Sequence, residues 1–447
     1  MQRVLGVETE YGLSAHAGGR RLSAPEAAEL LFRPVVAEHR SANAFLGSGG
    51  RLYLDVGAHP EYATPECRTA REELVAERAG DDLVLALAAR ASELAAGTGT
   101  DVTFRLFKNN TDSFGNSYGC HENYLVGRGL DLEPAVQLLT TFLITRQVLC
   151  GAGRWHRGEF TISQRADHLH TGLSALTTRA RPLVNTRDEP LADATRFRRL
   201  HVLAGDSNLA EPSAWLKVGT TLAVLELLDR PGGPDPRLAA LRLLDPAAAL
   251  RRVARDPLAP LELADGRTRT AVDLQRIHLE LAGEHAEPGL AALWARVLDA
   301  LADGEPERVA TEVEWVAKRR LLTEFQERHH LAADDSRLAQ LDLAFHELGG
   351  VFRVLEESGA VRRLTGPVEV ERALTAPPTA TRAAARSRLI TAASARNLRF
   401  TVDWQACTVH DLPGPDGRRV ERTLTLADPR ESRTAELEEL LAMLGPG

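Results

Sequence analysis

Several residue types and patterns are scarce or absent, and each absence argues against a class of protein. The chain has 447 residues and 4 cysteines, and no two cysteines form a CxxC pair. This spacing argues against a zinc site or a disulfide framework and predicts free, buried thiols. No apolar run approaches the roughly 20 residues that span a membrane. The N-terminal MQRVLGVETEYG lacks the pattern of a signal peptide. We therefore expect a cytoplasmic protein with no membrane contact.

Arginine carries nearly all of the positive charge. Lysine accounts for only 3 of the 54 basic residues, at Lys108, Lys217 and Lys318. The net charge of −8 is mild, so the chain lacks the basic footprint of a nucleic-acid-binding protein. Neither GxxxxGK[ST] nor GxGxxG occurs, which excludes a P-loop or a Rossmann nucleotide site.

The patterns that are present predict an α+β fold. Alternating apolar residues predict strands, and amphipathic stretches, one opened by a capping box of Ser23 and Glu26, predict helices. The strands are expected at 4–13, 51–56, 102–108 and 200–204, and the helices from about 25 and at 72–94, 134–150 and 214–228. From about 230 to 364 the pattern is mostly helical, and Pro377-Pro378 marks a boundary. We therefore expect a large domain over 1–376 and a small α/β domain over 377–447.

Two acids lie close together near the N-terminus. Glu8 and Glu10 are two residues apart on the first expected strand, so both carboxylates point to one face of it. A solvated surface strand is one interpretation. On a central strand, however, bare charge costs on the order of several kcal/mol. A divalent cation that prefers oxygen ligands, above all Mg²⁺, would offset that cost. Alone, the pair is a weak signal.

The stretch RLYLDVGAHPEYATPEC adds further polar groups. Arg51, Tyr53 and Asp55 share one face of the expected strand, and Glu61 follows after a turn. An ordinary salt bridge between Arg51 and Asp55 would explain part of the pattern. Two acidic strands in one domain instead favour a shared cleft for metal and phosphate.

Three more polar stretches contribute candidate groups. KNNTDSFGNSYGCHENY, which carries His121, is predicted as a loop that either holds phosphate or is a plain connection. Arg165 and Arg187 suit a triphosphate, because a guanidinium can bind two phosphate oxygens at once. Surface arginines are the plainer alternative. His201 lies in an apolar strand and is either a core histidine or a ligand.

Long motifs reach from Met1 to about Leu440 and are densest up to about Thr221. They are GVETEYG, GRLYLDVGAHPEYATPEC, KNNTDSFGNSYGCHENYL, LITRQVLCGAG, ISQRAD, NTRDEPLADATRFRRLHVLAGDSNLAE and FTVDW. Together they resemble the Pup ligase/deamidase family, which is related to glutamine synthetase and the other carboxylate–amine ligases.

That resemblance implies a fold and a reaction. The fold is a glutamine-synthetase-like curved antiparallel sheet backed by helices, followed by a small C-terminal α/β domain. The reaction uses ATP to phosphorylate the γ-carboxylate of the C-terminal glutamate of Pup, a small disordered protein modifier. A lysine amine of a target protein then attacks the acyl phosphate, and the isopeptide product goes to the bacterial proteasome. ATP as co-substrate, Mg²⁺, Pup and lysine-bearing proteins are the implied cofactors and partners.

The resemblance also implies the metal ligands and the catalytic group. Glu8, Tyr53 and Glu61 match the family's Mg²⁺ ligands, and we expect Glu10 to be a further one. Asp55 matches the catalytic base, which would take a proton from the attacking lysine. An electrostatic guide for the lysine ammonium is the alternative role of Asp55.

The resemblance also implies which residues contact the nucleotide. Arg51, Thr64 and Trp404 match ATP contacts. The wider family places further nucleotide, phosphate and metal contacts at four positions of this chain: His121, Arg165, Arg187 and His201.

Two features favour the ligase over its sibling, an amidohydrolase that releases Pup from lysine or deamidates its terminal glutamine. Depupylases carry a long loop before the matching strand, whereas the connection from Gly12 to Arg51 is short and largely helical. The wording LDVGAHPEYAT is also typical of ligases. A non-catalytic relative would have lost Asp55, Glu8 or Glu61, and a small-molecule glutamate–amine ligase fits the Pup-specific motifs less well. In a lysine ligase, the scarcity of lysine suggests limited self-modification.

Overall fold

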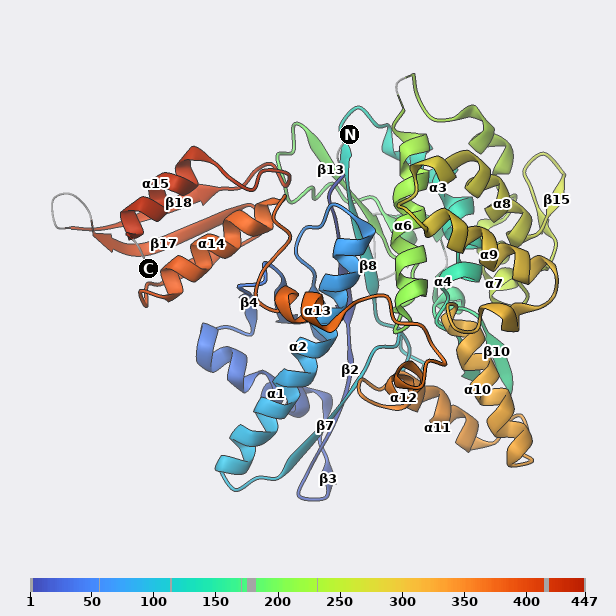
Figure 1. Cartoon of the computed structure of the whole chain (residues 1–447), viewed down its shortest axis with the longest axis horizontal. Helices are drawn as coiled ribbons and strands as arrows, with labels where there is room; N and C mark the ends of the chain where they lie inside the picture. The colour runs from blue at the N-terminus through green and yellow to red at the C-terminus, as the bar shows by residue number, and fades with distance from the viewer. Residues whose placement is uncertain are drawn as a thin grey trace.

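A sheet of eight strands forms the centre of the computed structural model, in the order β11-β12-β13-β8-β1-β6-β5-β4. The structure describes residues 3–55, 57–112, 115–169, 171–174, 182–230, 232–413 and 418–445. The paired strands run antiparallel, except that β11 and β12 run parallel. The predicted α+β fold, with a large antiparallel sheet and a small C-terminal sheet, is confirmed (Figure 1).

The central strands come from the first 202 residues of the chain. Their bounds are β1 Leu5–Glu10, β4 Asn43–Phe45, β5 Arg51–Leu54, β6 Pro60–Ala63, β8 Cys120–Gly127, β11 Thr171–Ser174, β12 Pro182–Asn185 and β13 Phe197–Val202. The N-terminal strand β1 is central, because β6 and β8 pair with its two edges.

The predicted strand at 4–13 is divided in two. After β1, the chain continues as β2 (Gly12–Ala17), which pairs with β3 (Arg20–Arg21) and β7 (Val102–Phe107) in a second sheet. Tyr11 lies at the division, fully buried, and its hydroxyl donates to Asp81 at 2.7 Å. This buried anchor holds the chain where it leaves one sheet for the other.

Two other sequence predictions were wrong in detail. The stretch 108–124 was predicted as a loop, but strand β8 begins within it at Cys120. The helix predicted at 134–150 is two helices, α3 (Leu132–Thr145) and α4 (Gln147–Cys150). They meet at Arg146, whose buried guanidinium donates to Glu122 at 2.8 Å and thereby ties this corner to β8. The predicted end of the strand 51–56, at Val56, lies outside the described residues.

Helices cover one face of the large sheet. α2 (Ala70–Gly97) packs against β1, and α6 (Glu211–Leu228) lies beside β8 (Figure 1). Alternate residues of the strands point into this layer because side chains alternate between the faces of a strand. The resulting core includes Leu5, Val7, Cys120, Tyr124, Val126, Leu200 and Val202 from the sheet and Leu216, Val218 and Val224 from α6.

The capping box predicted at Ser23 and Glu26 is present at the start of α1 (Ala24–His39), where the Ser23 amide donates to Glu26 at 2.8 Å. The four cysteines are free and buried, as predicted. Among the described residues, the other helical segments before the C-terminal part are η1 Ala166–His168, η2 Pro236–Leu241, α7 Pro246–Arg255, α8 Ala271–Ala282, η3 Gly283–His285, α9 Leu290–Ala302, η4 Pro306–Val309, α10 Glu314–Arg328, α11 Ser336–Phe345, α12 Val351–Glu357 and α13 Pro367–Ala373. Two small hairpins, β9 (Arg154–His156) with β10 (Glu159–Thr161) and β14 (Leu261–Glu262) with β15 (Thr268–Arg269), complete this part. Within the described residues, no helix is long and apolar enough to cross a membrane.

The C-terminal part forms its own layer of helices and strands, at one side of the molecule (Figure 1). α14 (Arg382–Ser394) and α15 (Ala435–Leu444) pack on a sheet of β16 (Phe400–Val402), β17 (Ala406–Pro413) and β18 (Arg419–Thr425). These elements share an apolar core that is separate from the main one. This separate core supports the boundary at 376/377, which stays a prediction.

One buried ion cluster joins the two parts. Glu66, just after β6, accepts hydrogen bonds from Arg382 at 2.7 Å and from Arg386 at 2.6 Å, both on α14. Burial would raise the pKa of Glu66, but the charges of Arg386 and Arg382 outweigh it and lower that pKa to about 2. The carboxylate is therefore ionised at neutral pH and is fully committed to this contact.

We predict that Glu66→Gln destabilises the joint between the two parts. Removing one partner of a buried ion cluster leaves the two arginines uncompensated, which typically costs about 3–5 kcal/mol. The urea midpoint of unfolding should fall accordingly. The matched control is Glu438→Gln, which breaks an exposed pair with Arg388 and should cost less than about 1 kcal/mol. Equal midpoints for the two variants would contradict the role of Glu66.

The same cluster makes a prediction about acid. The folded-state pKa of Glu66 is about 2, whereas an unfolded glutamate titrates near about 4.3. The stability that ionised Glu66 contributes is therefore complete above that unfolded value and is lost as the pH falls from it toward the folded pKa. Glu66→Gln should flatten the acid-side decline in the free energy of unfolding across this window. A decline as steep as that of the unmodified chain would show that other groups cause it.

Candidate active site

The face of the sheet opposite the helices carries a cluster of carboxylates. On β1, Val7 and Thr9 are each only 1% exposed and point into the helical layer, whereas Glu8 and Glu10 point to the other side. Glu61 of β6 is the cross-strand partner of Glu10. We call this surface the acidic face, defined by Glu8, Glu10, Tyr53, Glu61 and His121.

Strand register assembles the acidic face in two neighbouring rows. In the first row, Tyr53 pairs with Glu61 and Glu61 pairs with Glu10. In the second row, Arg51 and Glu8 flank Ala63, and Glu8 pairs with His121 on β8. Directly paired residues of an antiparallel sheet have Cβ atoms about 4.5–5.5 Å apart, so pairing alone brings these side chains together.

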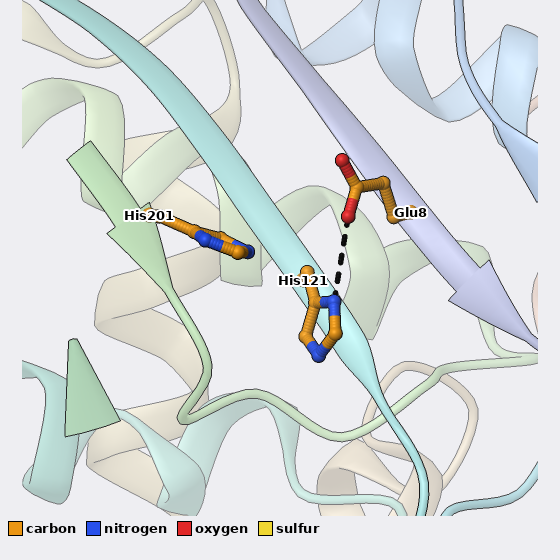
Figure 2. Close-up of side chains that lie close together, drawn as sticks. All are labelled: Glu8, His121 and His201. Carbon is orange, nitrogen blue, oxygen red and sulfur yellow. Dashed lines mark hydrogen bonds and ion pairs between the residues drawn. The ribbon is translucent and has the colours of Figure 1, made fainter. Parts of the chain in front are cut away.

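Two histidines lie beside Glu8. The imidazole Nδ1 of His121 lies 3.4 Å from a carboxylate oxygen of Glu8. The rings of His121 and His201 are 5.2 Å apart and nearly perpendicular. Figure 2 shows the three side chains projecting from β1, β8 and β13 toward a common space.

The charge state of Glu8 follows from these neighbours. Burial would raise the pKa of its carboxyl, but the hydrogen bond from His121 and the charges of His121, His201 and Arg199 outweigh burial and lower the pKa to about 2. Glu8 is therefore a permanent anion at neutral pH. Burial, together with the charge of His121, lowers the pKa of His201 to about 3, so its imidazole is neutral.

Glu61 has the opposite character. Burial raises its pKa first, and the negative charges of Glu8 and Glu10 add to the effect, so that the pKa reaches about 9. The same burial and the charges of Glu8 and Glu61 raise the pKa of the Tyr53 phenol. Glu61 is therefore protonated at neutral pH in the absence of a cation, and a bound cation would offset the repulsion between these acids.

The donor atoms fit a divalent cation. Two sets, Glu8 with His121 and His201, and Glu10 with Glu61 and His121, each offer ligand atoms that lie within 4.8 Å of one another. The Nε2 atom of His201 is buried and has no hydrogen-bond partner among the described residues. Carboxylate oxygens suit Mg²⁺ and Mn²⁺, and neutral imidazole is a common metal ligand.

A hollow lies next to the acidic face. Its wall includes Glu8, Thr64, Arg199 and Trp404 together with apolar residues of β1 and β8. The Thr64 hydroxyl accepts the Val7 amide at 3.0 Å and so joins β1 to the end of β6. Trp404 comes from the turn between β16 and β17 and is held edge-on by Phe45, at a ring distance of 5.0 Å. The predicted contacts Thr64 and Trp404 are therefore brought together from distant parts of the chain.

Arg51 and Asp55 do not pair with each other in the described structure. The Arg51 guanidinium donates to the Asn43 side chain at 2.7 Å and stacks 4.2 Å from the centre of the Tyr53 ring. Asp55 lies one residue beyond β5, half-buried, where its carboxylate accepts the amide of Gly57. Its negative charge contributes to the raised pKa of Glu61, which places Asp55 at the edge of the acidic face.

The two other predicted arginines have local partners. Arg165 is buried and donates to the carbonyl of Leu203 at 2.6 Å, so it holds the chain that leaves β13. Arg187 is more than half exposed on its side chain and pairs with Glu189 at 3.2 Å. The contacts described for these side chains therefore do not bring them to the acidic face.

Two further residues lie near Glu8, and neither was assigned a role in the predicted site. The Asn123 side chain donates to Glu8 at 3.3 Å, and Arg199 donates to Asn123 at 2.9 Å and lies 3.9 Å from Glu8. A signal existed in the sequence, because Asn123 is two residues from His121 and Arg199 is two residues from His201. Once those histidines are placed on strands, period two puts both neighbours on the same face.

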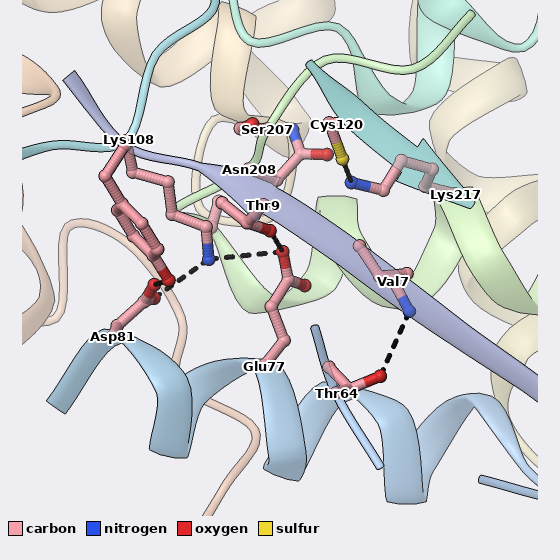
Figure 3. Close-up of polar contacts among 12 residues, drawn as sticks. Val7, Thr9, Thr64, Glu77, Asp81, Lys108, Cys120, Ser207, Asn208 and Lys217 are labelled. Atoms are coloured by element: carbon pink, nitrogen blue, oxygen red, sulfur yellow. Dashed lines mark hydrogen bonds and ion pairs between the residues drawn. The ribbon is translucent and has the colours of Figure 1, made fainter. Parts of the chain in front are cut away.

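The back of β1 is held by a buried ionic layer (Figure 3). The Lys108 ammonium lies 3.2 Å from Glu77 and 2.8 Å from Asp81, both on α2. The Thr9 hydroxyl donates to the same Glu77 at 3.4 Å. This layer lies on the side of β1 opposite the acidic face, and the Thr9 hydrogen bond joins β1 to α2.

Comparison with known proteins identifies relatives along nearly the whole chain. Residues 3–408 match the family described as Pup-ligase protein. The chain is 44% identical over 460 residues to the Pup–protein ligase of Sanguibacter keddieii, with 98% of this chain and 99% of that one covered. It is 41% identical over 472 residues to the Pup–protein ligase of Corynebacterium glutamicum, with 98% and 96% covered.

Two solved structures are similar to this chain in fold. One is the crystal structure of a complex between the prokaryotic ubiquitin-like protein Pup and its ligase PafA, with a TM-score of 0.89, 39% identity, and 99% of this chain and 91% of that chain covered. The other is the Pup ligase PafA in complex with ADP, with a TM-score of 0.82, 39% identity, and 95% and 94% covered.

The fold and the acidic face, together with these matches, define an enzyme of the ligase class. More narrowly, the chain belongs to the Pup-ligase protein family. The family resemblance predicted from the sequence motifs is therefore confirmed.

We predict that Mg²⁺ or Mn²⁺ raises the thermal midpoint of this protein. A ligand that binds only the folded state stabilises it by about 2.7 kcal/mol when its concentration is a hundredfold above Kd. Glu8→Gln should remove most of the cation-induced shift, because it deletes the permanent anion beside both histidines. The control Glu38→Gln, on the exposed surface of α1, should keep the full shift. A shift of equal size in both variants would place the cation elsewhere.

Proposed function

We propose that this chain joins the γ-carboxylate of the C-terminal glutamate of Pup to lysine side chains of other proteins, with ATP as co-substrate and a γ-glutamyl phosphate as intermediate. The observation that supports it most directly is the convergence of Glu8, Glu10, Glu61 and Tyr53 beside a hollow lined by Thr64 and Trp404. The similarity to PafA structures with Pup and with ADP supports the same reaction.

The hollow supplies the nucleotide site in this proposal. Its apolar wall and the Trp404 ring suit an adenine base, and Thr64 offers a hydroxyl at its edge. Arg51 and Arg199 lie on the side toward the acidic face, where guanidinium groups can bind phosphate oxygens. The roles predicted for His121 and His201 toward the nucleotide belong to the proposal as well. Those predicted for Arg165 and Arg187 stay predictions, because the described contacts of these two side chains are with Leu203 and Glu189.

The acidic face supplies the metal site. Glu8, Glu10, Glu61, Tyr53 and the two nearby histidines are the groups that would hold Mg²⁺. Bound Mg²⁺ neutralises phosphate charge that grows during phosphoryl transfer. Among the residues themselves, Glu8 is already an anion, whereas the raised pKa of Glu61 means that its proton must leave before it can act as a ligand.

Asp55 would prepare the attacking amine. A free lysine amine has a pKa near about 10.4 and is almost wholly protonated at neutral pH. It must lose a proton before it can attack an acyl phosphate. Asp55 lies half-buried at the edge of the acidic face, where it can attract the ammonium and accept that proton.

The amidohydrolase alternative is not favoured. Three curated relatives, from Sanguibacter keddieii, Corynebacterium glutamicum and Xylanimonas cellulosilytica, match along 98% of this chain at 41–44% identity and are named Pup–protein ligases. We further propose that the enzyme acts in the cytoplasm and that its products are degraded by the bacterial proteasome.

We predict that the purified chain, incubated with ATP, Mg²⁺, Pup ending in glutamate and a lysine-bearing protein, yields a Pup conjugate and ADP. Mass spectrometry should locate an isopeptide bond on lysine. The matched control is the same target after reductive dimethylation of its lysines, which should give no conjugate. If the chain released Pup from a ready-made conjugate and formed none, the amidohydrolase would replace the ligase.

We predict that Asp55→Asn lowers the conjugation rate by roughly 10²–10⁴-fold, the usual contribution of a general base. The asparagine side chain keeps an oxygen acceptor for the amide of Gly57, so the turn should stay folded. Nucleotide affinity, measured by calorimetry, should hardly change. Asp334→Asn, on an exposed loop, is the control. A decrease of less than tenfold would leave Asp55 as an electrostatic guide only.

A further inference from the structure

All three lysines of the chain are buried. They lie in the described part of the structure, with 2% of Lys108 exposed and 0% of Lys217 and of Lys318. Lysine is among the residues least often fully buried, because its ammonium is strongly hydrated. A chain in which each lysine is inside and none is on the surface is therefore unusual.

The ammonium group of each lysine also forms ion pairs or hydrogen bonds. Lys108 contacts Glu77 and Asp81 in the layer between β1 and α2 (Figure 3). This layer lies on the face of β1 opposite Glu8 and Glu10, so the Lys108 amine and the acidic face are separated by the sheet.

The other two lysines are equally enclosed. Lys217 on α6 donates to the carbonyl of Asp206 at 2.9 Å and contacts the sulfur of Cys120 at 3.4 Å, again on the helical side of the sheet. Lys318 on α10 pairs with Asp342 at 2.7 Å and donates to the carbonyl of Gly153 at 2.8 Å.

Arginine supplies the surface positive charge in place of lysine. The side chains of Arg20 and Arg353, for example, are 64% and 62% exposed, and each pairs with a glutamate on its own segment of chain. A guanidinium stays protonated at any physiological pH and has delocalised nitrogens. It therefore keeps the charge of the surface without offering a nucleophilic amine to an acyl phosphate.

We propose that this ligase presents no acceptor lysine of its own, so that it modifies other proteins without modifying itself on lysine. The inference rests on the proposed function, because it concerns the same acyl-transfer step. In that step the lysine nitrogen attacks the γ-carbonyl carbon of the glutamyl phosphate, phosphate leaves, and the ammonium proton goes to a base. Each buried lysine would have to leave its partners and cross the protein interior before it could attack.

Protonation and burial protect the three lysine amines from acylation to different extents. Burial alone would lower the pKa of Lys108, but the charges of Asp81 and Glu77 outweigh it and raise that pKa, which favours the non-nucleophilic ammonium. Burial dominates at Lys318 and lowers its pKa. Lys318 is therefore protected by enclosure rather than by charge, and it is the lysine that tests the inference most strictly.

The first experiment uses the ligase and a lysine-bearing target in one tube with Pup, ATP and Mg²⁺. Peptide mapping should find Pup on lysines of the target and none on Lys108, Lys217 or Lys318. Pup on any of these three would overturn the inference. An unmodified target would instead overturn the proposed function, so the two failures are distinguishable.

The second experiment adds an acceptor. Arg20→Lys and Arg353→Lys keep the charge and the local ion pairs but place an amine on the surface. At least one variant should carry Pup on the introduced lysine while its activity on the target stays unchanged. If neither variant is modified, lysine burial is not what protects the chain, and the inference fails.

A third measurement does not depend on ligase activity. An amine-reactive N-hydroxysuccinimide ester should label the three lysines of the native chain on the order of a thousandfold more slowly than in denaturing guanidinium chloride, because labelling requires a rare open state. The introduced lysine of Arg353→Lys is the internal control and should react rapidly in the native chain. Fast native labelling of Lys318 would overturn the inference directly.

Discussion

The pairing of β1 with β6 and β8 is the constraint on which the rest of the site depends. This pairing places Glu8, Glu10 and Glu61 on one surface, where like charges repel and burial adds to the cost. The sheet keeps this arrangement because the opposite side of β1 is held by the Lys108 layer and by the apolar core against α2 and α6. The free energy of folding thus stabilises a local concentration of charge that the residues would not adopt by themselves.

The unequal acidity of the carboxylates follows from the same pairing. Glu8 lies in the row that contains His121, whereas Glu61 lies in the neighbouring row with Glu10 and the Tyr53 phenol. Burial raises the pKa of both carboxyls; the cationic partners of Glu8 outweigh burial and lower its pKa, whereas the anionic partners of Glu61 add to burial. One strand register therefore yields two carboxyl groups of the same kind with different protonation at neutral pH.

The features that the sequence predicted best are those that depend on the local pattern of residues. Period-two spacing predicted that Glu8 and Glu10 share a face, and the capping box predicted the start of α1. Sequence reasoning failed where tertiary contacts decide the outcome. The stretch before Cys120 is rich in glycine and asparagine, so its local pattern does not indicate the start of β8. This segment is a strand because β1 pairs with one of its edges and β13 with the other. The helix break at Arg146 was also not predicted, and its side chain pairs with buried Glu122, which is distant in the sequence.

The candidate site was predictable to different extents. Residues close together in sequence, such as Arg51, Tyr53 and Asp55, could be grouped from their spacing. The family motifs named Thr64 and Trp404, although nothing in their own neighbourhoods indicates that they line one hollow. Arg199 and Asn123 were given no assigned role; that both meet at Glu8 depends on β8 and β13 lying side by side. The assigned roles of these residues remain predictions, whereas the family and the fold are confirmed.

Trp404 reaches the hollow from the C-terminal part, which is attached to the main sheet through Glu66 and two arginines of α14. One wall of the cavity thus belongs to a unit with a core of its own. Ligand binding and attachment are thermodynamically linked. A ligand that contacts both walls of the hollow therefore strengthens the attachment of the C-terminal part, by the same factor by which attachment raises the affinity for that ligand. Protease resistance of the C-terminal part would consequently report on whether the hollow is filled.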